Sequence, residues 1–187
     1  VTKPTRVTSI IWDFTDQSQL LFHDIRKFGW LRLVKPEQFE NIIAQYGVEP
    51  LSKKFTLEKF KAILAKRPKL KIKLLLMAQE LIAGIGNIYA DEALFDSKIH
   101  PARLAGKLKV KEINDLRLSI IKKLRQAIKL GGTSVNTFVS ASGARGGFVK
   151  KLKVYQRGGQ KCFRCNSILN KIKLGGRGTV FCPRCQK

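Results

Sequence analysis

The chain carries little negative charge, and its C-terminal part carries none. Only 13 of its 187 residues are Asp or Glu, against 37 Lys and Arg, so the formal net charge is +24. No acidic residue follows Asp115, whereas the last 72 residues include 17 basic ones, and the block Lys53 to Lys73 holds nine basic residues and one acid. Blocks of one sign repel each other without a polyanion, so nucleic acid is the expected partner. An anionic membrane surface and a solvated basic surface are the alternatives.

Long apolar runs and a secretory signal are also missing. No stretch of about 18 apolar residues occurs, so we expect no membrane-spanning helix, and no signal-peptide pattern opens the chain. The only Met is Met77, and Val1 to Phe14 already has the composition of a strand. We therefore expect a part of a longer protein or a shortened version of one. The length allows one or two small domains with a core.

Histidine is scarce, and neither of the two histidines has the neighbours that a metal ligand or a catalytic base would need. His100 has no Cys or His at ligand spacing and is followed by Pro101, and His23 has no adjacent nucleophile. Both are expected to be structural.

The first 34 residues have the composition of a small sheet. Arg6–Phe14 and Gln19–His23 are rich in β-branched and aromatic residues, with a polar turn between them, and Trp30–Val34 predicts a third strand. The apolar face of such a sheet needs a cover.

The middle of the chain predicts helices. In several stretches of this region, apolar residues recur at helical spacing, and glycine or proline marks many of the ends of these stretches. The expected helices cover residues 36–46, 56–67, 74–83, 87–98, 111–130 and 133–139.

The turn between the third and fourth of these helices is the most informative stretch. Gly84 and Gly86 can take positive φ and turn the chain sharply, and Asn87 is then placed as the N-cap of the next helix. Asp91 and Glu92 would follow early in that helix, where carboxylates suit its dipole. A glycine turn before a helix N-terminus can hold a phosphate, although a plain helical hairpin fits the spacing equally well.

All four cysteines lie in the last 26 residues, as two Cys-x2-Cys pairs separated by 16 residues. Each pair can place two thiolates on one ion, so the spacing predicts a structural, tetrahedral zinc site with no open position. Its ligands would be Cys162, Cys165, Cys182 and Cys185. The segment is too short for a core of its own, and Zn²⁺ would stabilise its fold. Two disulfides in a secreted protein are the alternative. Residues 168–174 and 179–181 predict a hairpin around residues 175–178.

The run GIGNIYADEALF, followed by KIHPARL, resembles the helix–two-turn–helix of the formamidopyrimidine-DNA glycosylase family. These base-excision repair enzymes remove oxidised purines, formamidopyrimidine and 8-oxoguanine, and cut the strand as abasic-site lyases. DIRKFG, residues 24–29, and the final CPRCQK resemble further parts of the family. The resemblance implies an α+β fold in three parts. These are the end of an N-terminal β-sandwich (1–34), a helix–two-turn–helix domain with a lid loop at 140–148 (35–150), and a four-cysteine zinc finger (151–187).

The resemblance also implies roles for particular residues. Arg26 and Phe28 would enter the duplex when the damaged nucleotide leaves it, with Phe28 as a wedge and Arg26 on the orphaned base. Without the family, a charged hairpin with Phe28 in the core is the simpler interpretation. Contacts to the DNA backbone are implied for Lys73, Asn87, Tyr155 and Arg177.

The glycine-rich segment that ends at Phe148 resembles the loop that closes over the extruded base, and its presence favours the formamidopyrimidine branch over the endonuclease VIII branch. Composition alone favours a linker between domains. The implied capping residues are Ser142, Gly143, Arg145, Gly147 and Phe148.

The family's nucleophile, the amine of an N-terminal proline followed by glutamate, has no counterpart here. Pro4 is internal, and no acid follows Val1. We therefore expect a chain that grips double-stranded DNA carrying an oxidised base or abasic site, without catalytic residues of its own. By resemblance it is a cytoplasmic, bacterial-type protein and a monomer. The alternatives are a non-catalytic binder of abasic or distorted DNA and a basic zinc-ribbon protein that binds RNA.

Overall fold

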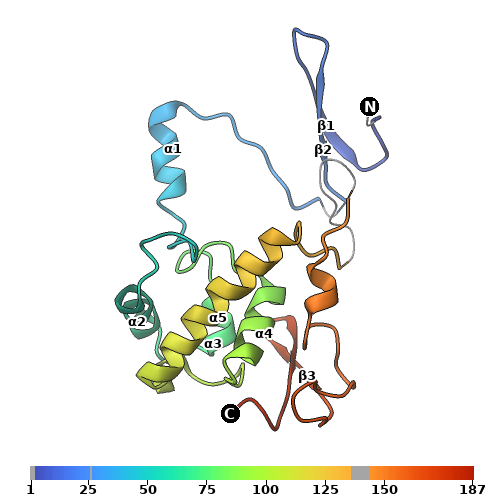
Figure 1. Cartoon of the computed structure of the whole chain (residues 1–187). Coiled ribbons are helices and arrows are strands. Elements are labelled where there is room, and N and C mark those ends of the chain that lie inside the picture. The colour runs from blue at the N-terminus through green and yellow to red at the C-terminus, as the bar shows by residue number, and fades with distance from the viewer. Residues whose placement is uncertain (1–2, 26, 136–143) are drawn as a thin grey trace. The chain divides into compact units, whose positions relative to one another are not determined.

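The computed structural model describes residues 3–25, 27–135 and 144–187. The chain separates into two compact units, Val1–Asn41 and Ile42–Lys187 (Figure 1). Helix α1 (Pro36–Ile43) spans the boundary between them.

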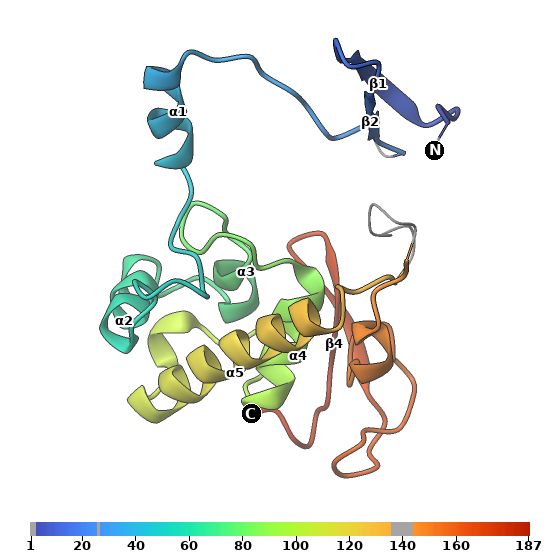
Figure 2. The same cartoon turned by 45° about the horizontal axis from the view of Figure 1, so that its top comes forward.

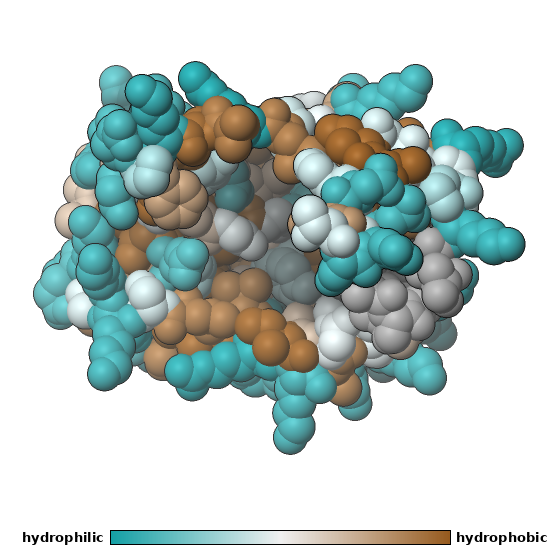
Figure 3. All heavy atoms as spheres, turned by 90° about the horizontal axis from the view of Figure 1, so that it is seen from above, coloured by the Kyte–Doolittle hydropathy of each residue, from teal (hydrophilic) through white to brown (hydrophobic). Residues whose placement is uncertain are grey.

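The first unit contains one antiparallel hairpin. Strands β1 (Thr8–Asp13) and β2 (Gln19–His23) pair with Trp12 opposite Leu20, and the register shifts between Thr8 and Ile10. The expected strand at Trp30–Val34 is wrong, because no strand forms there. An extended segment needs a neighbouring edge to satisfy its backbone groups, and the described part of this sheet has only two strands. Large apolar side chains of this unit stay exposed, Trp30 among them. Figure 3 draws one face of the whole chain, on which apolar areas lie between hydrophilic side chains.

The second unit is built around the long helix α5 (Val110–Lys129), which confirms the amphipathic helix expected at 111–130. It packs against α4 (Asn87–Asp96) and α2 (Leu57–Lys66), as both views show (Figures 1 and 2). The side chain of Thr56 caps α2 by accepting from the amide of Lys59. Short 3-10 turns, η1 (Ala105–Lys107) and η2 (Phe148–Lys151), flank α5 in sequence.

The helix expected over 74–83 is much shorter. Helix α3 (Ile72–Leu76) ends at Leu76, and turns lead from there to Gly84, whose φ is 81°. The apolar residues that suggested a longer helix are core contacts of these turns: Ile82 and Ile85 are both fully buried. Backbone bonds from Gly47 to Gln79 and from Ala83 to Val48 hold the turns in place.

The C-terminal hairpin forms as expected, with strands β3 (Asn170–Leu174) and β4 (Arg177–Phe181) antiparallel. Its turn is shorter than the sequence suggested: only Gly175 and Gly176 form it, with φ of 51° and 76°. Positive φ at both central residues is what a type I′ hairpin turn needs. Arg177 is therefore the first residue of β4 and pairs with Leu174.

The order of elements along the chain, a hairpin, then helices, then a second hairpin, confirms the α+β class. Among the residues that the structure describes, no helix is long and apolar enough to cross a membrane.

Candidate nucleic-acid interface and metal centre

Asn87 lies where the glycine turn meets α4, but it does not cap the helix. Gly86 occupies the N-cap position and offers no side chain, so the first amides of α4 have no side-chain cap. The Asn87 side chain donates instead to the carbonyl of Gly178 on β4, at 3.2 Å. Its Oδ1 atom is buried and accepts from none of the described residues. The expected cap was wrong, and the uncapped helix end remains available to an anion.

Lys73 also lies elsewhere than expected. It is 0% exposed, and its Nζ lies 2.7 Å from the Oδ1 of Asp91, so the expected exposed contact with a DNA backbone does not agree with this geometry. The ammonium also donates to the carbonyl of Gly178 at 3.1 Å and the hydroxyl of Thr179 at 2.7 Å. Burial lowers the pKa of Lys73 and raises the pKa of Asp91 to about 6, against the opposing effect of the ion pair.

Asp91 completes this connection by accepting from the amide of Val180 at 3.2 Å. The hairpin strand β4 is thus fixed to α3 and α4 over Gly178–Val180, immediately beside Arg177. Arg177 itself is exposed. Asp91 was expected near the positive end of the helix dipole, but the first turn of α4 contains no acid.

Glu92 fixes the segment that carries Tyr155 to α4 in a similar way. Its fully buried carboxylate accepts from three successive amides, those of Lys153, Val154 and Tyr155, at 2.8 to 3.0 Å. Such an arrangement fixes a backbone that belongs to no strand or helix. The half-buried Tyr155 is therefore held beside the N-terminal end of α4.

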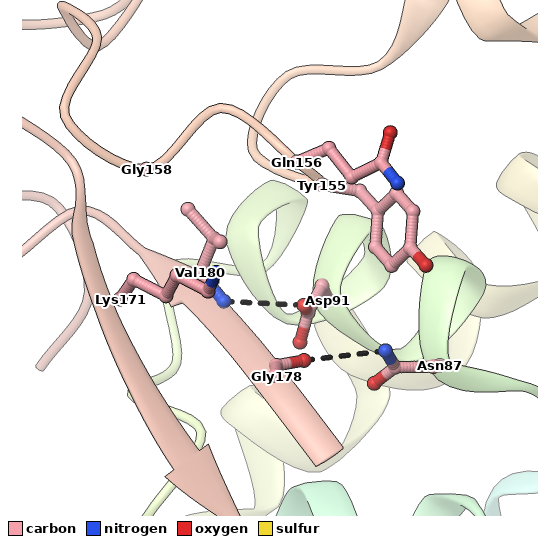
Figure 4. A pocket seen from close by; sticks show the side chains of 8 residues that line it. All are labelled: Asn87, Asp91, Tyr155, Gln156, Gly158, Lys171, Gly178 and Val180. Atoms are coloured by element: carbon pink, nitrogen blue, oxygen red, sulfur yellow. Dashed lines mark hydrogen bonds between the residues drawn. The ribbon is translucent and has the colours of Figure 1, made fainter. Parts of the chain in front are cut away.

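These connections surround a cavity of about 450 Å³ (Figure 4). In the figure, Asn87 and Asp91 extend from α4 toward β4, and Tyr155 lies across from β4. The lining residues are Asn87, Asp91, Tyr155, Gln156, Gly158, Lys171, Gly178 and Val180. The structure thus brings together Asn87 and Tyr155, with Arg177 next to a lining residue. Asp91 and Glu92 were expected from the sequence to have a different role, at the helix dipole, and Gln79 was not singled out. Carboxylates within a helix that also carries buried apolar residues were the signal available for Asp91 and Glu92.

Gln79 shapes the turn itself. Its side-chain amide donates to the carbonyl of Ile85, and its oxygen accepts from the amide of Gly84 at 2.8 Å. The turn that leads into α4 is therefore held by side-chain hydrogen bonds of Gln79 as well as by the positive φ of Gly84.

Phe28 belongs to the first unit and is 74% exposed, so it does not lie in a core of that unit. The turn before it is held by Asp24, whose carboxylate accepts from the amides of Lys27 and Gly29. Lys27 takes a φ of 54° there. Arg26 lies outside the described residues.

Only the C-terminal end of the expected capping segment, residues 144–148, is described. Ser142 and Gly143 lie outside the described residues. Gly146 donates to the Ser134 hydroxyl at 2.7 Å, and Gly147 to the carbonyl of Leu130 at 2.8 Å. Arg145 is exposed. Phe148 is fully buried, its ring 5.9 Å from that of Tyr89. The expectation that Phe148 belongs to a loop over the base is corrected: it is a core residue that anchors the segment.

The four cysteines form the metal centre. Their sulfur atoms all lie within 4.8 Å of one another, with Cys162 and Cys185 at 4.0 Å and Cys165 and Cys182 at 3.5 Å. Four sulfurs at about 2.3 Å from Zn²⁺ would be about 3.8 Å apart, whereas a disulfide needs about 2.05 Å. The arrangement fits one structural zinc ion, held by all four cysteines, and disagrees with paired disulfides.

The pKa values of the thiols differ within the cluster. Burial raises the pKa of Cys185 to about 12, and a hydrogen bond from Ser167 lowers that of Cys165 to about 6. Four thiolates this close repel one another, and a divalent cation removes the repulsion. Arg164, inside the first knuckle, donates to the carbonyls of Phe95 and Asp96 at the end of α4, which joins the zinc finger to the helices.

Comparison with known families agrees with this geometry. The family described as the formamidopyrimidine-DNA glycosylase H2TH domain matches residues 46–139. The family described as the zinc finger found in FPG and IleRS matches residues 159–187. The chain belongs to the formamidopyrimidine-DNA glycosylase family.

Individual relatives cover nearly the whole chain. The formamidopyrimidine-DNA glycosylase of Listeria innocua is 44% identical over 98% of this chain and 67% of its own length. The MutM (Fpg) protein of Thermus thermophilus superposes with a TM-score of 0.91 at 36% identity, covering 98% of this chain and 70% of that one. A Lactococcus lactis Fpg, solved in complex with DNA containing an abasic site, superposes with a TM-score of 0.88 at 40% identity. The match covers 100% of this chain and 68% of that one. This chain thus spans about two thirds of the length of these glycosylases.

Proposed function

We propose that this chain is the DNA-gripping part of a base-excision repair glycosylase that removes oxidised purines and acts as an abasic-site lyase. The observation that carries the proposal is the cavity between α4 and β4, where Asn87 and Tyr155 meet beside Arg177. Its Lactococcus lactis relative was solved with DNA containing an abasic site.

The chemistry of this cavity suits a sugar-phosphate backbone. The uncapped amides at the start of α4 point out of the helix end, which favours an anion. Tyr155 can donate its hydroxyl, and Arg177 can donate two parallel hydrogen bonds to one phosphate. Asn87 holds the carbonyl of Gly178 and thereby keeps the hairpin beside the helix end. Such contacts fix the position of the duplex without reading its sequence.

Residues of the first unit and the 140–148 segment would supply the base-directed steps. Phe28, with its large exposed fraction, fills the space that an extruded nucleotide leaves, and Arg26 donates to the base opposite. Ser142, Gly143, Arg145 and Gly147 would cover the extruded base, with Phe148 as the fixed end of the segment. We further propose that the protein acts as a monomer on cytoplasmic bacterial DNA.

Borohydride trapping on a duplex with one abasic site tests the enzymatic part of the proposal. In this family chemistry an amine attacks the sugar C1′ and forms a Schiff base, which borohydride reduces to a stable adduct. We expect this chain alone to bind the duplex without forming an adduct. A chain extended by the N-terminal third of the Listeria innocua relative should form one.

An adduct formed by the 187 residues alone would show that Val1 or a lysine serves as nucleophile, and the proposed division of roles would be wrong. Equal affinity for intact and abasic duplexes would instead favour a general DNA binder. Tighter binding to RNA of equal length would favour the zinc-ribbon alternative.

A further inference from the structure

A second cavity, of about 580 Å³, lies in the second unit and shares no residue with the cavity at Asn87. One wall is helix α2, with Lys54 just before it. The other wall consists of residues 46–48 and the turn residues Glu80 and Leu81. We call this cavity the α2 groove.

The face of α2 that lines the groove has an apolar floor and a basic rim. Lys59, Ala62, Ile63 and Lys66 follow one another at helical spacing, so they lie on one side of the helix. Ile63 is 3% exposed and forms the floor, whereas Lys59 and Lys66 are exposed. Seven residues of α-helix span about 10 Å, which is about the axial rise of three nucleotides in one DNA strand. The two ammonium groups are thus spaced for a chain of phosphates.

The charges of the groove are not compensated within the described part of the chain. Lys54, Lys59 and Lys66 form no ion pair with any described carboxylate. The one acid in the lining, Glu80, lies 3.6 Å from the guanidinium of Arg67, with both side chains about half exposed. Three neighbouring ammonium groups repel one another, and an anionic occupant relieves that repulsion. Tyr46, 49% exposed, adds a hydroxyl donor to the rim.

The wall opposite α2 is rigid and continuous with the first site. The amide of Gly47 donates to Gln79, and a Cβ atom at Gly47 would lie 2.0 Å from the carbonyl carbon of Leu81. Gln79 in turn accepts from Gly84, just before α4. The hydrogen-bonded turns between α3 and α4 therefore form part of the groove wall and also lead directly to Asn87.

We propose that the α2 groove binds the sugar-phosphate backbone of the same duplex, beyond the phosphates held near Asn87, Tyr155 and Arg177. The groove lengthens the DNA footprint and raises affinity without adding sequence preference. This inference rests on the proposed function, because it takes the occupant of the first site to be DNA.

Two triple variants of equal charge test the proposal. In the groove variant, Lys54, Lys59 and Lys66 are each replaced by Gln. In the control variant, Lys53, Lys61 and Lys69 are replaced by Gln; these exposed lysines belong to the same stretch of sequence but do not line the groove. Affinity is measured against salt concentration for an abasic duplex of about 10 base pairs and for one of about 30, that is, one and three helical turns. Circular dichroism confirms that each variant is folded.

Each lost phosphate contact lowers the salt slope of log K by about 0.9. We expect the groove variant to lose about 2 to 3 from this slope on the long duplex and almost nothing on the short one. The control variant should match the wild type on both. An equal loss in the two variants would reduce the effect to general charge and overturn the proposal. Loss on the short duplex as well would place these lysines at the first site, which also contradicts it.

Arg177→Ala separates the two proposals. If Arg177→Ala weakens both duplexes while the groove variant behaves like its control, only the groove inference fails. If Arg177→Ala has no effect and the groove variant still loses its slope, the groove binds DNA and the role given to the Asn87 site fails.

Discussion

Lys73 and Asp91 form an ion pair inside the protein, with Nζ and Oδ1 2.7 Å apart and side chains 0% and 1% exposed. Lys73 comes from α3 and Asp91 from α4, and both also bond to residues 178–180 of β4. The pair therefore connects three elements beside Arg177, where β4 begins. Its contribution is positional: the desolvation of two charges offsets much of their attraction, but a displaced β4 would move Arg177.

Removing one partner of this pair is expected to lower the free energy of unfolding. Lys73→Met leaves a buried carboxylate without its counter-charge and should destabilise the protein by about 3 to 5 kcal/mol at pH 7. The double variant Lys73→Met/Asp91→Asn should lose much less than the sum of the two single variants. Urea unfolding of all four proteins gives the coupling energy. Additive losses would show that the pair does not act as a unit.

The raised pKa of Asp91 predicts a pH dependence with a definite sign. A carboxyl group whose pKa rises from 3.8 to about 6 on folding contributes stability that is fully present below pH 3.8 and is lost as the pH rises through about 6. The free energy of unfolding of the wild type, minus that of Asp91→Asn, should therefore fall between pH 4 and pH 7. Taking this difference cancels the other carboxyl groups. A difference that rises with pH would contradict the assignment.

Glu92→Gln should loosen the segment that carries Tyr155. The carboxylate accepts from three amides, and a Gln side chain presents an NH₂ group to one side of that cluster. We expect a loss of about 1 to 3 kcal/mol in stability and faster hydrogen exchange at residues 153–155. Affinity for DNA should fall with it. Glu49→Gln, at an exposed position, is the control. Unchanged exchange would mean that the amides are held by something else.

Arg177→Ala should weaken duplex binding equally at all sequences, because its proposed contact is a phosphate. The salt slope should become less steep by about 0.9. Arg125→Ala, on an exposed part of α5, removes the same charge and should change little. Binding by Arg177→Ala that matches this control, or a loss that depends on sequence, would exclude a backbone role.

Zinc removal should unfold the chain from about Val154 onward and leave α5 helical. The hairpin has a small core, built around Cys162, Cys182 and a few apolar side chains, so the metal supplies most of its stability. Hydrogen exchange after chelation should be fast in β3 and β4 and slow in α5, with DNA affinity lost and recovered on adding Zn²⁺. Loss of DNA binding while zinc remains bound would break the proposed link between metal and grip.

The sequence by itself determined the local features of this protein. The Cys-x2-Cys spacing predicted the metal centre, the helical repeat of α5 predicted its length within a residue at each end, and Thr56 predicted a cap. Each of these signals lies within one short stretch of sequence, where the local geometry follows directly from the residue types. The turn at Gly84 was visible for the same reason, whereas Gly86 has a φ of -103° and not the expected positive value.

Only the tertiary structure decided what the polar residues around that turn do. Lys73 donates to the carbonyl of Gly178, 105 residues further along the chain. Asn87 donates to the same carbonyl, 91 residues away, and does not cap its helix. Helix α3 stops early because the residues after it satisfy their backbone groups with residues 47 and 48. A buried charge or amide must take whichever partner folding brings near, since leaving it unpaired costs more than abandoning its local preference. No local pattern records that partner.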